Sequence, residues 1–536
     1  MAVGVGTLRP CVPVLLCCLL PVVHRASAQA TPPVPLRELV YRDIDVLGAA
    51  GLLDSLIVGE RPYSRREIVR LLREAQTNLG RRGDSAGWAA RAIAEDLQRY
   101  ADTPLKVVES VSADAAYLDS PARGVPADSN GRVDAEINPL AAYRQGRRLY
   151  DGGTTAFESR HALALDRHVV LSLEPRVSVA ARRATNGASS LSVRSGEMSL
   201  LFAKIAIGIG RENIVFGQAP SGGLVLSNNA PALDVIRVST DRPFTLPWLF
   251  RLLGPLRGTA FIADLGPHQN FPHAKLIGYK LSGVIHPQFE LGAQVIDEMS
   301  GSGSPPGLLR DRLYDLVPLI DIFNTRTDYL FSNKFAGIDF RWRLPRLYGF
   351  ELFGEGALDD LDARRWKSSF LEDGGYIGGF SFSCLVECGT LRLHGEYHQT
   401  GIRYYTHYQF TTGIAENRFL LGDPLGPRGL GAYVTVDRAE RRLGVFSVVA
   451  AHEVRSGNRY ASVASGAEQR DFHFVQIERH PGETRTRLSG NWAGAPWTSS
   501  VLARLSAGIE RVTNFDFVAG ADRTNVLAQL TVEYRP

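Results

Sequence analysis

Apolar and polar residues alternate along most of the chain, from about residue 106 to its last residues. In the final stretch, alternate positions are apolar: Val526, Ala528, Leu530, Val532 and Tyr534. The positions between them are mostly polar: Leu527, Gln529, Thr531 and Glu533. Successive side chains of a strand project to opposite faces. The pattern therefore predicts a strand with one apolar face and one mostly polar face.

The same alternation recurs often enough to predict a single large sheet. Residues 105–536 leave room for about eighteen strands at roughly two dozen residues per strand and connection, within the even-numbered range of bacterial barrels. We interpret the apolar run Leu201–Ile209 as one of these strands. A soluble β-sandwich shows the same alternation but does not need so many consecutive strands. We therefore predict an all-β transmembrane β-barrel of antiparallel strands over residues 105–536.

Residues 1–28 have the pattern of an export signal. Arg9 is the only charged residue before the apolar run Cys11–Val23, and Ala26-Ser27-Ala28 supplies small residues for cleavage. The run is too short, and too interrupted by proline, to make a good membrane-spanning helix. The sequence thus predicts a cleaved signal peptide, and with the strands it predicts a protein of the cell outer membrane.

Helical periodicity precedes the strands. Apolar residues recur at helical spacing between Tyr41 and Leu53 and between Ser85 and Tyr100. Ser64 and Glu67 have the spacing of a capping box at the start of a helix between these two. A bundle of about seventy residues is marginal on its own. We expect residues 29–104 to form a periplasmic helical bundle that packs on a larger unit.

Two long segments without clear strands interrupt the predicted barrel. They cover residues 220–258 and 301–333, and segments of this length usually carry function or fold as a plug. Both ends of a bacterial barrel normally face the periplasm, which would place residues 519–525 in an outer loop. The turn at residues 493–496 would then be periplasmic.

The overall charge excludes one class of partner. The chain has 60 basic and 56 acidic residues, without a basic block long enough to argue for nucleic acid. Outside the signal, only Cys384 and Cys388 remain, and their spacing suits a small disulfide or two free thiols equally well. Because the chain has neither a nucleophile elbow nor a zinc-protease motif, we expect no enzymatic activity and no cofactor.

One strand carries three residues that could bind a metal. His394, Glu396 and His398 share one face, but polar residues lining a barrel lumen have the same pattern, and we favour that interpretation. We therefore expect no metal. A second polar group is expected to form a cross-strand charge ladder in the lumen: Arg341, Arg343, Glu351 and Glu355.

The first long segment contains an aromatic run bounded by proline, Pro243–Arg251. Phe244 and Trp248 could stack on sugar rings, and Arg251 could bond to hydroxyls or acidic sugars. The alternative is a folded plug whose aromatic side chains pack against the barrel wall. We take Phe244, Trp248 and Arg251 as candidate ligand-binding residues.

Two stretches of the chain, Phe216–Ser239 and His273–Asp297, carry a family resemblance. Together with the order of elements, they resemble the capsule-assembly (Wzi-type) outer-membrane family, in which a periplasmic helical bundle precedes a large barrel. The matching motif residues are Gly217, Gly222, Gly223, Ser227, Asn228 and Asn229. Glycines in such a motif permit tight backbone paths, so the motif can be structural. Gln218-Ala219 departs from the Pro-Gly expected after Gly217.

The resemblance implies a lectin-like, non-catalytic protein that binds or organises capsular or extracellular polysaccharide at the cell surface. An outer-membrane channel for polar solutes is the alternative, since arginine, glutamate and histidine line the predicted lumen. Expected partners are therefore a polysaccharide and outer-membrane lipid. Residues 59–65 also resemble an S-layer-homology bundle, which leaves contact with the cell wall or a periplasmic partner open.

Overall fold

A computed structural model describes most of the chain after the predicted signal peptide. The described ranges are residues 30–83, 87–125, 135–182, 188–220, 222–305, 332–359, 370–464 and 472–536. The predicted signal peptide lies outside the described residues, as does most of the expected segment 301–333.

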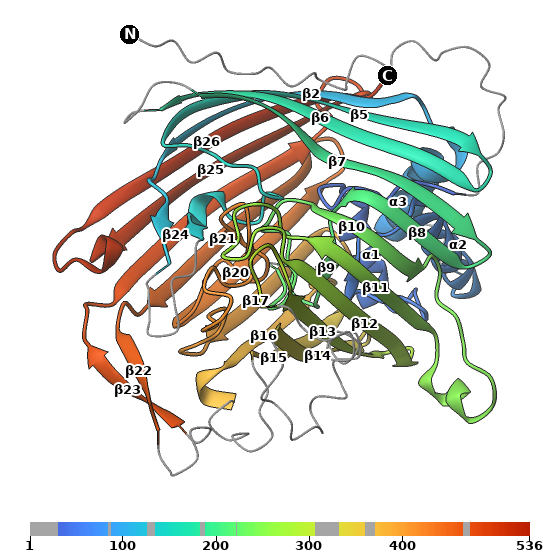
Figure 1. Ribbon diagram of the computed structural model, residues 1–536. Helices are drawn as coiled ribbons and strands as arrows, with labels where there is room; N and C mark the ends of the chain where they lie inside the picture. Colours follow the sequence, from blue (N-terminus) through green and yellow to red (C-terminus); the bar gives the residue numbers. More distant parts are fainter. Residues whose placement is uncertain are drawn as a thin grey trace, which may run out of the picture.

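Eighteen antiparallel strands in these ranges form a closed barrel (Figure 1). In chain order they are β2 (Val108–Asp119), β5 (Gly152–Asp166), β6 (Val169–Arg182), β7 (Ala188–Phe202), β8 (Ile205–Glu212), β10 (Leu233–Thr240), β11 (Leu256–Asp264), β12 (Lys275–His286), β13 (Phe289–Met299), β14 (Ser332–Leu344), β15 (Phe350–Asp359), β16 (Gly374–Phe382), β17 (Leu391–Thr400), β20 (Gly429–Glu440), β21 (Gly444–Arg455), β24 (Glu483–Gly494), β25 (Val501–Thr513) and β26 (Arg523–Tyr534). The last strand, β26, pairs with the first, β2, and closes the barrel. The predicted fold class and strand number are confirmed.

Strand β26 shows how the alternation of the sequence becomes a wall. Leu530 and Tyr534 face outward and are about half exposed, whereas Gln529 and Glu533 face the lumen and are buried. One strand was predicted wrongly: the run Leu201–Ile209 is divided by a turn at residues 203–204, where the chain passes from β7 to β8. Ala203 has a φ of 55°, so the backbone reverses without a glycine or proline to mark the turn.

The outward face carries an aromatic belt near the end of the barrel where the helices lie. Its members sit within three residues of a strand end: Phe289, Trp342, Phe350, Phe382, Phe446, Trp492 and Tyr534. Aromatic side chains favour the boundary between lipid and water. The belt therefore marks one edge of the lipid-facing band. We call this end of the barrel the bundle end.

Three helices form the bundle: α1 (Val40–Ala49), α2 (Arg65–Arg81) and α3 (Trp88–Leu97), the last extended by a π-helical turn at Gln98–Asp102. Ser64 caps α2, because its hydroxyl accepts a hydrogen bond of 3.1 Å from the backbone N–H of Glu67. The helices bury one apolar core between them. Among the described residues, none of the helices is long and apolar enough to cross a membrane.

The bundle docks on the turn between β16 and β17. Cys384 and Cys388 form a disulfide within this turn. The backbone N–H of Trp88 donates to Glu387 at 2.8 Å, and the Arg42 guanidinium bonds to the carbonyl of Gly389. Gly389 has a φ of +83°, and a Cβ there would lie 2.2 Å from the ring of Trp88. Close packing of the indole on this turn therefore requires glycine.

We expect Gly389→Ala to loosen the docking of α3. The alanine meets the indole ring, and overpacking of this kind costs about 1–3 kcal/mol. Gly520→Ala is the matched control, because Gly520 has a similar φ of +71° and no neighbour within 4 Å of its would-be Cβ. Hydrogen–deuterium exchange of the α3 amides should rise in Gly389→Ala alone. Equal exchange in both variants would contradict the role assigned to Trp88.

Segments entering from both ends fill the lumen (Figure 1). From the bundle end, β1 (Glu60–Arg61) pairs with β9 (Val215–Phe216), which precedes the motif stretch. At the opposite end, the connections between barrel strands contain three further two-stranded sheets: β3 (Arg123–Gly124) with β4 (Glu136–Ile137), β18 (Ala415–Glu416) with β19 (Phe419–Leu420), and β22 (Arg459–Ala464) with β23 (Phe472–Glu478). Much of this filling shares one buried apolar core with the wall. We call the lumenal segments the plug.

The expected segment 220–258 differs from its structure in one respect. Residues 222–232 belong to the plug, but β10 is a barrel strand, and the chain then turns at the bundle end before β11. The turn contains a short 3-10 helix, Trp248–Leu253. This range therefore contains two separate structures, one inside the lumen and one at the bundle end.

Candidate functional site

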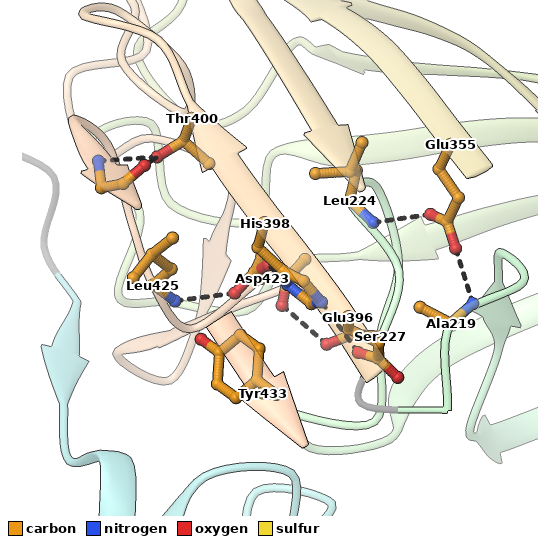
Figure 2. Close-up of polar contacts among 12 residues, drawn as sticks. Ala219, Leu224, Ser227, Glu355, Glu396, His398, Thr400, Asp423, Leu425 and Tyr433 are labelled. Atoms are coloured by element: carbon orange, nitrogen blue, oxygen red, sulfur yellow. Dashed lines mark hydrogen bonds and ion pairs between the residues drawn. The ribbon is translucent and has the colours of Figure 1, made fainter. Parts of the chain in front are cut away.

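The backbone in the first half of the motif stretch, residues 217–231, is held by the carboxylate of Glu355 on the wall strand β15. Its oxygens accept backbone N–H bonds from Ala219 at 2.9 Å and Leu224 at 3.2 Å (Figure 2). They also accept one from Gln218 at 2.5 Å. The left-handed φ of Gly217, +132°, and of Gly222, +117°, allow the chain to wrap around the carboxylate. The glycines therefore serve the backbone path, as the sequence suggested.

The polar half of the motif joins three segments of the plug. Ser227 donates from its hydroxyl to the carbonyl of Gly422 at 2.6 Å, and Asn229 donates from its side chain to the carbonyl of Leu420 at 2.9 Å. The side chain of Asn228 donates to the carbonyl of Tyr143 at 3.3 Å. The structure thus brings the motif residues together in a structural role.

Gln218, the departure from the expected motif, connects the plug to three charged wall residues. Its amide nitrogen donates to Glu290 at 2.9 Å and to Asp339 at 2.8 Å, and its carbonyl oxygen accepts from Arg341 at 3.0 Å. Asp339 is also paired with Lys280, and neither of these two side chains is exposed. A glutamine supplies the donors and acceptor that proline and glycine lack.

A second polar network joins the wall strand β17 to the loop at Asp423, beside the motif stretch. The two ring nitrogens of His398 on β17 lie 2.5 Å from Asp423 and 2.8 Å from Glu396 (Figure 2). His394 contacts the other oxygen of Glu396. These side chains are buried and bind one another. Within the described ranges, no three His, Cys, Asp or Glu side chains are placed to hold a metal ion.

The expected charge ladder forms in part. Arg341 lies 3.1 Å and Arg343 lies 3.4 Å from opposite oxygens of Glu351, on the neighbouring strand. Glu355, expected as the fourth member, instead accepts backbone N–H groups of the plug. A residue pattern cannot reveal this difference, because the plug residues that Glu355 binds are distant in the sequence.

The aromatic run lies apart from all of these residues. Phe244 forms an isolated bridge with Leu256 at the bundle end, and Trp248 and Arg251 lie on the 3-10 helix of the turn. The Trp248 side chain is 93% exposed. Sugar binding by Phe244, Trp248 and Arg251 therefore stays a prediction, and it would take place at the bundle end of the barrel.

A surface at the end of the barrel opposite the bundle carries aromatic and basic side chains that the sequence analysis did not identify. We call it the mouth, comprising residues 135–151 and 401–428. Arg148 covers the ring of Phe419 at 5.2 Å and lies 3.4 Å from Glu136. Tyr408, which is 63% exposed, packs against the ring of His407 at 4.8 Å. Residues so far apart in the chain give no common signal in the sequence.

Glu416, on the β18–β19 hairpin of the mouth, makes this hairpin sensitive to pH. Burial raises the pKa of Glu416 to about 7, against a lowering by Arg211 and with a further rise from Asp234. Between about pH 4.5 and about pH 7 the folded hairpin holds more protons than the unfolded one. Its stability therefore falls as the pH rises through this window.

We expect the β18–β19 amides to lose protection several-fold from about pH 5 to about pH 8, beyond the intrinsic change of exchange rate with pH. Glu416→Gln should abolish this loss, because glutamine does not ionise. Exchange measured by mass spectrometry, expressed as protection factors, checks the expectation. A wild-type protection factor that stays constant with pH would contradict it.

Comparisons with known proteins agree on one family. The family model described as "Capsule assembly protein Wzi" matches residues 123–527. A Klebsiella pneumoniae protein described as an uncharacterized 55.8 kDa protein in the cps region is 26% identical over 173 residues, which cover 31% of this chain and 33% of that protein. The match thus spans only about a third of this relative.

A solved structure has the same fold. It is described as Wzi, an outer membrane protein involved in group 1 capsule assembly in Escherichia coli and a carbohydrate-binding β-barrel. At 16% identity, the alignment covers 95% of this chain and 100% of that chain, with a TM-score of 0.65. The resemblance drawn from the motif stretch is therefore confirmed. The chain belongs to the capsule assembly protein Wzi family.

Proposed function

We propose that this protein binds or organises capsular or another extracellular polysaccharide at the cell surface, as a non-catalytic barrel of the outer membrane. Membership of the family supports the proposal, as does the carbohydrate binding attributed to the Escherichia coli structure. The observation that carries it is the plug. The carboxylates of Glu355 and Glu290 accept buried hydrogen bonds from the plug, and Ser227 donates one within it. These bonds fix the plug in the lumen, so the mouth is the surface on which a long polymer would lie.

The side chains of the mouth suit a polysaccharide. Tyr408 offers an exposed ring, and aromatic rings stack on the apolar faces of sugars. Arg148 and Arg418 add guanidinium groups, which bind carboxylates and hydroxyls through several donors. Both pair with Glu136 at 3.4 and 2.8 Å, so their positions are already fixed before a ligand arrives. The sugar would thus meet an organised surface.

A channel for polar solutes is the alternative function. The motif stretch crosses the lumen, and its Leu224 shares one buried apolar core with Tyr405 of the mouth and Phe335 of the wall. We therefore expect wild-type protein in a planar bilayer to conduct little. Steady conductance that discriminates among polar solutes would favour the channel instead.

Retention of polysaccharide on cells tests the proposal directly. A deletion strain should release polysaccharide into the medium while the total amount stays constant, and the wild-type gene should restore the cell-bound fraction. Unchanged retention after deletion would overturn the proposal.

Binding to the purified protein tests the mouth separately. Tyr408→Ala combined with Arg148→Ala should weaken binding of isolated surface polysaccharide by about tenfold, or about 1.4 kcal/mol. Trp497→Ala is the control, since Trp497 is 68% exposed on the turn between β24 and β25 at the bundle end. Equal binding by the mouth variant and the control would move the site elsewhere. Binding of the helical bundle to a periplasmic partner or to the cell wall stays a prediction.

A further inference from the structure

The turn between β10 and β11 exposes an unusual set of apolar side chains. Trp248 is 93% exposed, Leu249 74%, Phe250 61% and Leu252 72%, all on one short 3-10 helix. Burying such side chains is worth about 25 cal/mol for each Å² of apolar surface removed from water. A cluster this exposed indicates an apolar partner.

The turn folds back over the outward face of the barrel. Leu256 faces outward on β11, because its neighbour Arg257 faces the lumen and contacts Glu60, yet Leu256 is only 4% exposed. A Cβ on the outward-facing Gly283 of β12 would lie 2.6 Å from the Leu256 side chain and 3.3 Å from the carbonyl of Leu253. The 3-10 helix thus lies on the side of the wall that faces lipid.

Glycine permits this contact at a second position. Gly254, which follows the 3-10 helix, has a φ of +69°, and a Cβ there would lie 1.9 Å from the carbonyl of Val284 on β12. The backbone of the turn therefore rests directly on the rim of the barrel. Figure 1 shows the turn beyond the ends of β10 and β11, below the helices of the bundle.

The surroundings identify the partner as lipid. The outward side chains that continue from the turn along the wall are apolar and exposed: Ile236, Val238, Ile262, Leu281 and Ile285. The aromatic belt lies at this same end, so the turn is level with the boundary between lipid and water. Tryptophan, phenylalanine and leucine beside a basic residue are typical of segments that lie in a membrane interface, where Arg251 would meet lipid phosphates.

We propose that the β10–β11 turn is a membrane foot, inserted at the phospholipid headgroups of the leaflet at the bundle end. The foot extends the lipid contact of the barrel beyond the cylinder of its strands, on one side only. It fixes the rotation and depth of the barrel beneath the mouth. The proposal does not depend on polysaccharide binding.

A fluorescent label on Leu249→Cys tests the proposal in the full protein. Both described cysteines are joined in the disulfide, so a thiol-reactive bimane would attach to the new residue. Ile338→Cys, on the outward face of β14, serves as the lipid reference, and Val518→Cys, on the turn between β25 and β26, serves as the water reference; both parent residues are more than half exposed. The protein is placed in vesicles of phosphatidylethanolamine and phosphatidylglycerol.

Lipids that carry a nitroxide at the headgroup should quench the label at position 249 several-fold more than the label at position 518. Lipids with a nitroxide deep in the acyl chain should quench the label at position 338 most. Equal quenching at positions 249 and 518 by every lipid would overturn the proposal. If the label at position 249 responds only when isolated polysaccharide is added, the turn is a sugar-binding surface and the lipid assignment is wrong.

Discussion

Replacing Lys280 with methionine is expected to destabilise the barrel by about 3–5 kcal/mol, the usual cost of breaking a buried ion pair by removing one partner. Lys280 and Asp339 are both fully buried, and the lysine is the cation that balances this carboxylate. Without it, the amide of Gln218, at 2.8 Å, is left to stabilise a buried negative charge. In detergent gel electrophoresis, a folded barrel migrates faster than the unfolded chain. The temperature at which samples shift from the folded to the unfolded band should fall clearly.

A second substitution separates charge from packing. Adding Asp339→Asn to Lys280→Met removes the uncompensated charge and should recover a large part of the stability. Lys204→Met is the control, because Lys204 is exposed on the turn between β7 and β8. A loss of stability in the double variant as large as in Lys280→Met would show that packing, and not charge, is responsible.

Glu355→Ala is expected to release the plug. The substitution leaves the N–H groups of Gln218, Ala219 and Leu224 without their acceptor, at a cost of about 1–3 kcal/mol for each buried group. Exchange of these three amides should accelerate, and the protein should gain conductance in a planar bilayer. The barrel itself should keep its strand pairing, because the ladder of β15 uses backbone groups alone.

Two further variants test whether the effect is specific to the carboxylate of Glu355. Glu355→Gln keeps one acceptor oxygen and should give an intermediate effect. Glu440→Ala should have none, because Glu440 lies at the end of β20, where its carboxylate pairs with Arg438 of the same strand. If Glu355→Ala exchanges and conducts like the wild type, the motif stretch is held by its other contacts, and Glu355 is not the anchor.

The wall of the barrel could be predicted because its physics is local. Every strand must present an apolar face to lipid, so Leu530 and Tyr534 alternate with Gln529 and Glu533 whatever lies on the neighbouring strands. The error at residues 201–209 has a local cause as well. Ala203 and Lys204 turn the chain without any residue that favours a turn, and the apolar alternation continues across them.

The sequence pointed to plug-like segments, but the contacts of the plug could not be predicted, because they join residues far apart in the sequence. Nothing in the pattern pairs Glu355 with Gln218, or Ser227 with Gly422, over a hundred residues away. The aromatic run at residues 243–251 was recognised as exceptional in composition. Its place at the bundle end depends on the direction of β10, a strand that the sequence did not reveal.

The pairing of β1 with β9 has a mechanical consequence. A polymer held at the mouth would be dragged by flow past the cell, and the pull would pass through the loop at Gly422 and the motif stretch to Phe216. From there β9 passes the load to Glu60 in β1, and Glu290 takes part of it from Val58 and Gly59 into the wall. The force is thus shared among many hydrogen bonds across the whole barrel, and a single flexible loop does not bear it alone.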